Sequence, residues 1–192
     1  MDAGAPRIIF LGDSLTAGLG VDIDQSFPSL IQARLTREHY RYKVVNAGVS
    51  GDTSAGGLRR LEWALAEGDP QVLVVALGGN DGLRGLQPEQ LEQNLAQIIE
   101  HAQARNMRVI LAGMEAPPNF GDDYTRRFRA VYPALAAKYK IPLIPFLLDG
   151  VAGNPSLNQS DGIHPNPRGA QIVADLVWRT LAPQLTPAAT SR

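Results

Sequence analysis

The chain has 192 residues and a formal net charge of −1, from 18 lysines and arginines against 19 aspartates and glutamates. This length suits one well-buried domain and is short for two, so we expect a single domain over residues 1–192. The balanced charge gives no reason to expect nucleic acid or an anionic membrane as a partner. The absence of cysteine excludes disulfides, a thiol nucleophile and cysteine metal ligands.

The sequence holds no apolar run close to the roughly 20 residues that a membrane-spanning helix requires. We therefore expect no stable membrane insertion. Residues 1–6 lack the basic and apolar regions of a signal peptide. From the sequence alone, the protein is either cytoplasmic or a mature form restarted at Met1.

Five short apolar runs alternate with longer segments of helical periodicity. Most of the runs are rich in valine, isoleucine and leucine, as is typical of parallel strands buried on both faces. The predicted strands are Arg7–Leu11, Tyr42–Asn46, Gln71–Leu77, Arg108–Gly113 and Ile141–Phe146.

Five apolar stripes at helical spacing lie between and after these runs. Trp63 is a further candidate for the second stripe, and Pro88 suits the first turn of the third helix. The stripes are Phe27, Leu30, Ile31 and Leu35; Leu58, Leu61 and Leu65; Leu91, Leu95, Ile98 and Ile99; Phe128, Val131, Tyr132 and Leu135; and Ile172, Val173, Leu176 and Val177.

Strands that alternate with helices predict an α/β fold, a three-layer α/β/α sandwich around a five-stranded parallel sheet. Right-handed crossovers place the loops that follow the strands at one edge of this sheet. Ligands in such folds bind outside the carboxyl ends of the strands. Functional residues are therefore expected in the loops after Leu11, Asn46, Leu77, Gly113 and Phe146.

The first of these loops, residues 12–18, reads Gly-Asp-Ser-Leu-Thr-Ala-Gly. A serine at the end of the first strand is well placed as a nucleophile, with its backbone N–H directed at developing negative charge. Serines also cap helices often. This loop alone therefore leaves Ser14 equally a nucleophile or a helix cap.

The second and third loops combine glycines with polar side chains. In residues 46–53, glycines permit close approach to a ligand, although a plain turn before a helix capped by Asp52 or Thr53 explains the same residues. In residues 78–82, the Asn80 amide could donate to an oxyanion, although Asn, Asp and Gly are also the usual turn residues. Neither loop alone distinguishes a functional site from an ordinary turn.

The last loop contains Asp161 and His164, which are close enough in sequence to hydrogen-bond directly. Such a carboxylate fixes the histidine tautomer and stabilises the imidazolium. The other histidines, His39 and His101, fall in helical segments without a nearby candidate partner. A nucleophile, a backbone donor, an amide donor and an acid–base pair thus share one edge of the sheet. These are the groups that acyl transfer requires.

The four loops resemble the sequence blocks of the SGNH hydrolases, also called GDSL esterases or lipases. The blocks read Gly-Asp-Ser-Leu at 12–15, a glycine at 51, Gly-Gly-Asn-Asp at 78–81 and Asp-Gly-Ile-His at 161–164. Longer runs, such as Leu-Gly-Gly-Asn-Asp-Gly-Leu-Arg-Gly and Asp-Gly-Ile-His-Pro-Asn, are similar to a bacterial branch of this family described as thioesterases, lysophospholipases and arylesterases.

The resemblance implies a flavodoxin-like sheet and a serine esterase with Ser14, Asp161 and His164 as its catalytic triad. It implies an oxyanion hole made by the backbone N–H groups of Ser14 and Gly51 and the side-chain amide of Asn80. It also implies no metal or cofactor, a monomer, and a periplasmic or secreted location. The expected substrates are small-molecule esters and thioesters, including aryl esters, short- to medium-chain acyl esters, acyl-CoA and lysophospholipids.

Several residues around the site keep alternatives open. Gly48 is a rival to Gly51 as the backbone donor. Asp13, Asp52 and Asp81 flank the site and are interpreted as holding its loops, with a metal site as the alternative.

Four residues are predicted to border an acyl groove, and packing beneath the loops explains each of them about as well. The resemblance also implies that residues 81–88 form a mobile flap, with Gly82 and Gly85 as hinges. The four predicted substrate-binding residues are Leu83, Leu86, Pro118 and Phe120.

Two other functions compete with a general esterase. A carbohydrate O-deacetylase of the same family would use identical catalytic residues. A nucleotide-binding module is disfavoured, because residues 12–20 lack both the Gly-x-Gly-x-x-Gly spacing and the Gly-Lys-Ser/Thr ending that phosphate binding uses.

Overall fold

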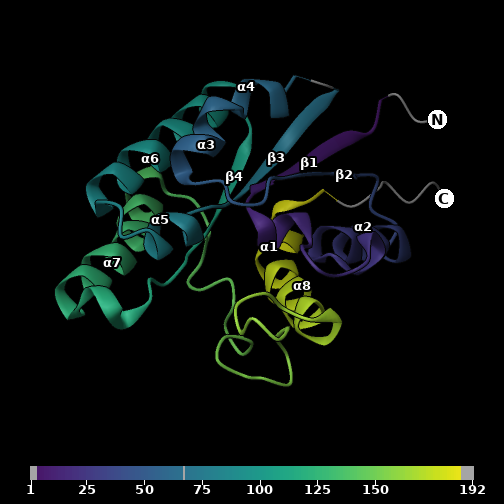
Figure 1. The fold of residues 1–192 in the computed structure, drawn as a ribbon. Coiled ribbons are helices and arrows are strands. Elements are labelled where there is room, and N and C mark those ends of the chain that lie inside the picture. The colour runs from purple at the N-terminus through teal and green to yellow at the C-terminus, as the bar shows by residue number, and fades with distance from the viewer. Residues whose placement is uncertain (1–3, 67, 187–192) are drawn as a thin grey trace.

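The structure is a computed structural model that describes residues 4–66 and 68–186. Its centre is a parallel five-stranded sheet with the strand order β2-β1-β3-β4-β5 (Figure 1), which is the flavodoxin-like order. This confirms the predicted α/β fold. The strands are β1 (Pro6–Gly12), β2 (Lys43–Gly48), β3 (Asp69–Ala76), β4 (Arg108–Ala112) and β5 (Leu143–Ile144).

Helices cover both faces of the sheet, as Figure 1 shows. Helices α2 and α8 pack against each other on one face, and α3, α6 and α7 form the layer on the other. The α-helices are α1 (Ser14–Ala17), α2 (Phe27–Arg37), α3 (Ser54–Arg59), α4 (Leu61–Ala64), α5 (Gly79–Leu83), α6 (Pro88–Ala104), α7 (Asp122–Tyr139) and α8 (Pro167–Leu181). Short 3₁₀ helices span Ile23–Gln25, Pro118–Phe120 and Ala182–Gln184.

The core lies on the two central strands, β1 and β3, which are paired on both sides. Ile8, Phe10 and Leu11 are fully buried on β1, as are Val72 and Val74 on β3. Both faces of these strands meet helices, so their sequences are continuously apolar rather than alternating. This rigid centre carries the two loops that begin at Asp13 and Leu77.

Two elements differ from the sequence prediction. The last strand is reduced to Leu143–Ile144 because Pro142 and Pro145 flank it and have no N–H to donate to a ladder. The second predicted helix is divided at Arg60 into α3 and α4. The placement of Trp63 in the apolar stripe is wrong, because that side chain is 74% exposed.

Among the residues described, no helix combines the length and the apolar character needed to cross a bilayer.

Candidate active site

Ser14 opens helix α1 directly after β1. The preceding residue, Asp13, is the N-cap, and its Oδ1 accepts a hydrogen bond from the N–H of Leu15 at 3.0 Å. The helix is therefore capped by Asp13 rather than by Ser14, so the Ser14 hydroxyl is not used as a cap. Gly12 permits this tight turn, since a Cβ there would lie 1.9 Å from Oγ1 of Thr16.

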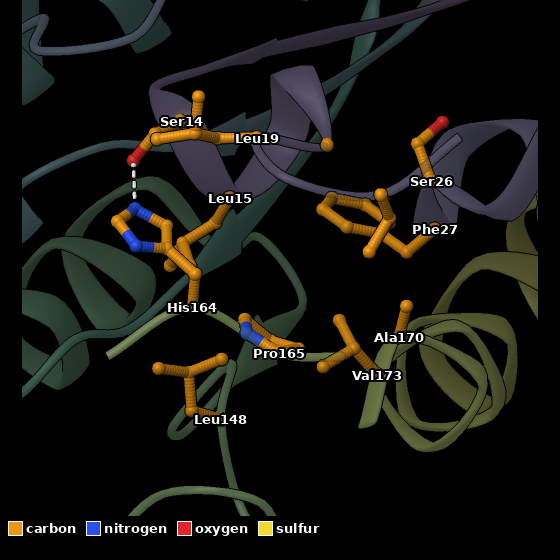
Figure 2. Close-up of a pocket in the computed structure, with 12 residues that line it drawn as sticks. Ser14, Leu15, Leu19, Ser26, Phe27, Leu148, His164, Pro165, Ala170 and Val173 are labelled. Atoms are coloured by element: carbon orange, nitrogen blue, oxygen red, sulfur yellow. Dashed lines mark hydrogen bonds between the residues drawn. The ribbon is translucent and has the colours of Figure 1, made fainter. Parts of the chain in front are cut away.

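Ser14, His164 and Asp161 form a continuous chain of hydrogen bonds. Ser14 Oγ lies 2.8 Å from His164 Nε2, the dashed contact in Figure 2. His164 Nδ1 lies 2.7 Å from Asp161 Oδ2. These are the three residues that the sequence predicts as a triad, and the fold brings Ser14 and His164 together across 150 positions of the chain.

Asp161 is held as a carboxylate by its own loop. Its Oδ1 accepts the backbone N–H groups of His164 at 3.0 Å and of Ile163 at 2.9 Å. These two bonds, with the contact to the His164 side chain, lower the pKa of Asp161 to about 2. Asp161 is therefore ionised at neutral pH, and its Oδ2 is available as an acceptor for the imidazole N–H.

The loop that carries His164 is fixed through Gln159. The Gln159 backbone N–H donates to the carbonyl of His164 at 2.8 Å. Its side-chain amide donates to the carbonyls of Leu19 at 2.7 Å and Pro165 at 3.0 Å. Since Leu19 follows α1, one glutamine joins the histidine loop to the loop of the nucleophile.

Asn80 lies in the first turn of α5, just after β3. Its amide Nδ2 donates to the backbone carbonyl of Asp52 at 2.9 Å and lies 3.5 Å from Oδ2 of Asp13. Both neighbours are acceptors, so they orient the amide nitrogen toward the site. The turn itself requires glycine at position 78, where φ is +116° and a Cβ would lie 2.0 Å from the Tyr132 hydroxyl.

The two candidate backbone donors differ in availability. The N–H of Gly48 donates to Asn46 Oδ1 at 3.0 Å. The N–H of Gly51 has no hydrogen-bond acceptor within residues 4–66 and 68–186. Gly51 is exposed, and its φ of +84° is in the region that glycine favours. This difference favours Gly51 over Gly48 as a donor.

The flanking aspartates hold the loops together. Asp52 Oδ2 pairs with Arg60 Nε at 2.6 Å. Asp81 is buried and accepts both the N–H and the hydroxyl of Ser54, at 2.8 and 2.5 Å. In the described part of the chain, no group of three or more histidine, cysteine, aspartate or glutamate residues is arranged to hold a metal ion.

A largely apolar groove of about 470 Å³ leads away from Ser14, Asn80 and His164. Of the predicted substrate-binding residues, Leu83 and Pro118 line it. Leu86 and Phe120 do not. The other apolar side chains along the groove include Met114, Ala116, Pro117, Phe146, Leu148 and Ile163.

The segment between residues 78 and 86 rests on a row of aromatic rings. Tyr132 lies under Gly78, Phe128 lies under Gly82, and Phe120 lies against Gly85. Tyr124 adds a hydrogen bond from its hydroxyl to the carbonyl of Leu86 at 2.7 Å. Phe120 and Tyr124 therefore support the segment that carries Asn80 and Leu83, and Leu86 is the end of that segment rather than a groove residue. The predicted hinge motion stays a prediction.

A second, smaller cavity also borders Ser14 and His164. Figure 2 shows its apolar wall, to which Leu15, Phe27 and Val173 contribute. Its volume of about 20 Å³ has room for about one water molecule. An acyl chain therefore fits the larger groove and not this cavity.

Asp13 is 2% exposed, and burial is the main reason why its pKa is raised to about 6. A raised folded-state pKa means that stability falls as pH rises from the unfolded value of 3.8 through about 6. Asp13→Asn keeps a capping oxygen and carries no charge. We expect the variant to match wild type near pH 4 and to exceed its unfolding free energy by up to about 3 kcal/mol above pH 6.

Urea unfolding of both proteins between pH 4 and 8 tests this expectation, with the exposed Asp122→Asn as control. A difference that stays constant across this range would contradict it.

A serine, a histidine and an aspartate linked by hydrogen bonds at the carboxyl edge of a parallel α/β sheet define a serine hydrolase. A family model described as GDSL-like Lipase/Acylhydrolase family matches residues 10–172, and the chain belongs to this family.

Similar proteins match over almost the whole chain. Esterase TesA of Pseudomonas aeruginosa is 49% identical, over 95% of this chain and 91% of its own length. The thioesterase 1/protease 1/lysophospholipase L1 of Escherichia coli K12 is 41% identical, over 94% of this chain and 86% of its own. A crystal structure of TesA superposes with a TM-score of 0.89 at 48% identity, covering 94% of this chain and 99% of the other.

Proposed function

We propose that the protein is a single-domain serine ester hydrolase that forms an acyl-enzyme on Ser14. The observation that carries the proposal is the chain of hydrogen bonds from Ser14 through His164 to Asp161, 2.8 and 2.7 Å long, at the end of an apolar groove. Nucleophile, base and orienting carboxylate in this sequence are the arrangement that activates a serine hydroxyl.

In the proposed mechanism, His164 takes the hydroxyl proton as Ser14 Oγ attacks the acyl carbonyl. Asp161 keeps the proton of the imidazole on Nδ1 and stabilises the imidazolium. Nε2 then gives the proton to the leaving alcohol or thiol, and afterwards activates a water molecule that releases the acid. No cofactor has a step in this sequence.

The negative charge of the tetrahedral intermediate needs donors that are already in place. We assign this role to the backbone N–H groups of Ser14 and Gly51 and to the amide of Asn80. Two observations support the assignment: the N–H of Gly51 has no acceptor among the described residues, and the amide of Asn80 is oriented by its bond to the Asp52 carbonyl.

The groove supports substrates with an apolar acyl chain. Leu83, Met114 and Phe146 line it beyond the hydrogen-bonded pair, so burial of methylene groups would contribute to binding. We propose carboxylic esters as substrates, including aryl and short- to medium-chain acyl esters, and thioesters such as acyl-CoA. Lysophospholipids fit the same description.

The test is hydrolysis of p-nitrophenyl esters from acetate to palmitate and of matching acyl-CoA thioesters, beside acetylated oligosaccharides. We expect kcat/KM on the esters to rise with chain length beyond acetate while the groove still buries additional methylene groups. Turnover of acetylated sugars alone would replace this proposal with a carbohydrate O-deacetylase. Absence of turnover on every ester and thioester would overturn both.

We also propose a monomer in the periplasm or secreted from the cell, on the basis of the family resemblance. Light scattering coupled to size exclusion tests the first point. Fractionation of the source cell with a compartment marker tests the second.

A further inference from the structure

Arg60, at the junction of α3 and α4, binds three separate parts of the site. Its Nε donates to Asp52 Oδ2 at 2.6 Å, its Nη1 to the carbonyl of Ala47 at 2.7 Å and its Nη2 to the carbonyl of Gly12 at 2.8 Å. Gly12 ends β1 just before Asp13 and Ser14, and Ala47 lies near the end of β2. One guanidinium thus joins the ends of two neighbouring strands to the loop that follows the second.

The loop held by Arg60 carries the groups assigned to the oxyanion. Gly51 immediately precedes Asp52 in the sequence. The backbone carbonyl of Asp52 accepts the Asn80 amide at 2.9 Å. The position of the Asp52 backbone therefore affects where the Gly51 N–H and the Asn80 amide lie. Arg60 in turn binds the Asp52 carboxylate.

We propose that Arg60 is a positioning residue for the oxyanion-binding groups, an inference that rests on the proposed function. Its side chain is 16% exposed and that of Asp52 is 17% exposed, so solvent screens this ion pair less than a surface pair. The planar guanidinium directs three donors in fixed directions, which a lysine ammonium does not. Charge assistance strengthens each of the three bonds.

This role predicts a particular kinetic signature. Misplacement of a catalytic donor by about 1 Å costs up to about 100-fold in rate. A group that acts only on the oxyanion lowers kcat and kcat/KM together and leaves KM nearly unchanged. We therefore expect Arg60→Met to lose about tenfold to 100-fold in kcat on a p-nitrophenyl ester, with KM close to the wild-type value.

Two further variants make the test specific. Arg60→Lys keeps the charge beside Asp52 without the three directed donors, so its kcat is expected to lie between those of wild type and Arg60→Met. Arg59→Met is the matched control, because Arg59 is the neighbouring residue, is exposed, and its side chain has no hydrogen bond or ion pair within the described residues. Each kcat is divided by the fraction of folded sites that a fluorophosphonate titrates. If Arg60→Met does not fold, the kcat values of Arg60→Lys and Asp52→Asn per titrated site are compared with the wild-type value instead.

A double-mutant cycle then asks through which group Arg60 acts. Asn80→Ala alone is expected to cost about 10²–10³ in kcat. If Arg60 acts through Asn80, the Arg60 substitution costs much less in the Asn80→Ala background than in wild type. Additive losses would exclude Asn80 and leave Gly51 as the group through which Arg60 acts. A normal kcat per titrated site in the Arg60 variants would overturn the inference. Failure of the proposed function is distinguishable, because wild type itself would then lack esterase activity or retain it without Ser14.

Discussion

Ester hydrolysis by the Ser14→Ala variant is expected to fall by roughly 10⁶-fold, to the detection limit of the assay. The reason is the geometry around the hydroxyl. Ser14 Oγ is the atom 2.8 Å from His164 Nε2, and alanine leaves the imidazole without a proton to remove. Asp13 rather than Ser14 caps α1, so the substitution removes the nucleophile without removing a helix cap.

The measurement is the initial rate on a p-nitrophenyl ester, together with the melting temperature and mass labelling by a fluorophosphonate. We expect one label on wild type and none on the variant. Ser160→Ala is the matched control, since Ser160 is exposed in the histidine loop. A folded Ser14→Ala protein with wild-type rate would remove Ser14 from the mechanism.

The second large effect is expected for Asp161→Asn, which should lose up to about 10⁴-fold in kcat. An asparagine oxygen can still accept the backbone N–H groups of Ile163 and His164, so the loop is expected to keep its shape. Its NH₂ group would then face Nδ1 of His164 and donate to it. This reverses the tautomer and places a proton on Nε2. That nitrogen can then no longer act as a base toward Ser14.

Rates of Asp161→Asn are measured from pH 5 to 9, with the exposed Asp149→Asn as control. Because the pKa of Asp161 is about 2, its carboxylate stays ionised over this whole range. The loss is therefore expected at every pH. A variant within tenfold of wild type would show that Asp161 has no catalytic part.

The sheet was predictable from the sequence because its strands are buried on both faces. Runs such as those around Ile9 and Val74 have no polar alternation, and they match β1 and β3 closely. The periodicity of Leu58, Leu61 and Leu65 did not reveal the break at Arg60. Arg60 is the cap residue between the two helices, and its guanidinium binds carbonyls at the ends of two strands, which become its neighbours only in the folded protein.

The site was predictable to the extent that it follows strands. Ser14 and Asn80 come directly after β1 and β3, so the edge rule of parallel sheets was enough to bring them together. The same rule would have found Met114 and Phe146, since they follow β4 and β5, but apolar residues after a strand carry no distinctive chemistry. The prediction of Leu86 as a groove residue fails because its contact with the aromatic row cannot be read from the sequence.

The order of the catalytic residues along the chain has a consequence for folding. Ser14 lies near the start of the sequence and His164 lies 150 residues later, beyond the last strand of the sheet. During synthesis on the ribosome, the Ser14 hydroxyl therefore emerges long before the His164 imidazole has been synthesised. If both residues act as proposed, hydrolysis begins only when the segment after β5 docks against α1. Regain of esterase activity during refolding would report the arrival of that last segment rather than the collapse of the sheet.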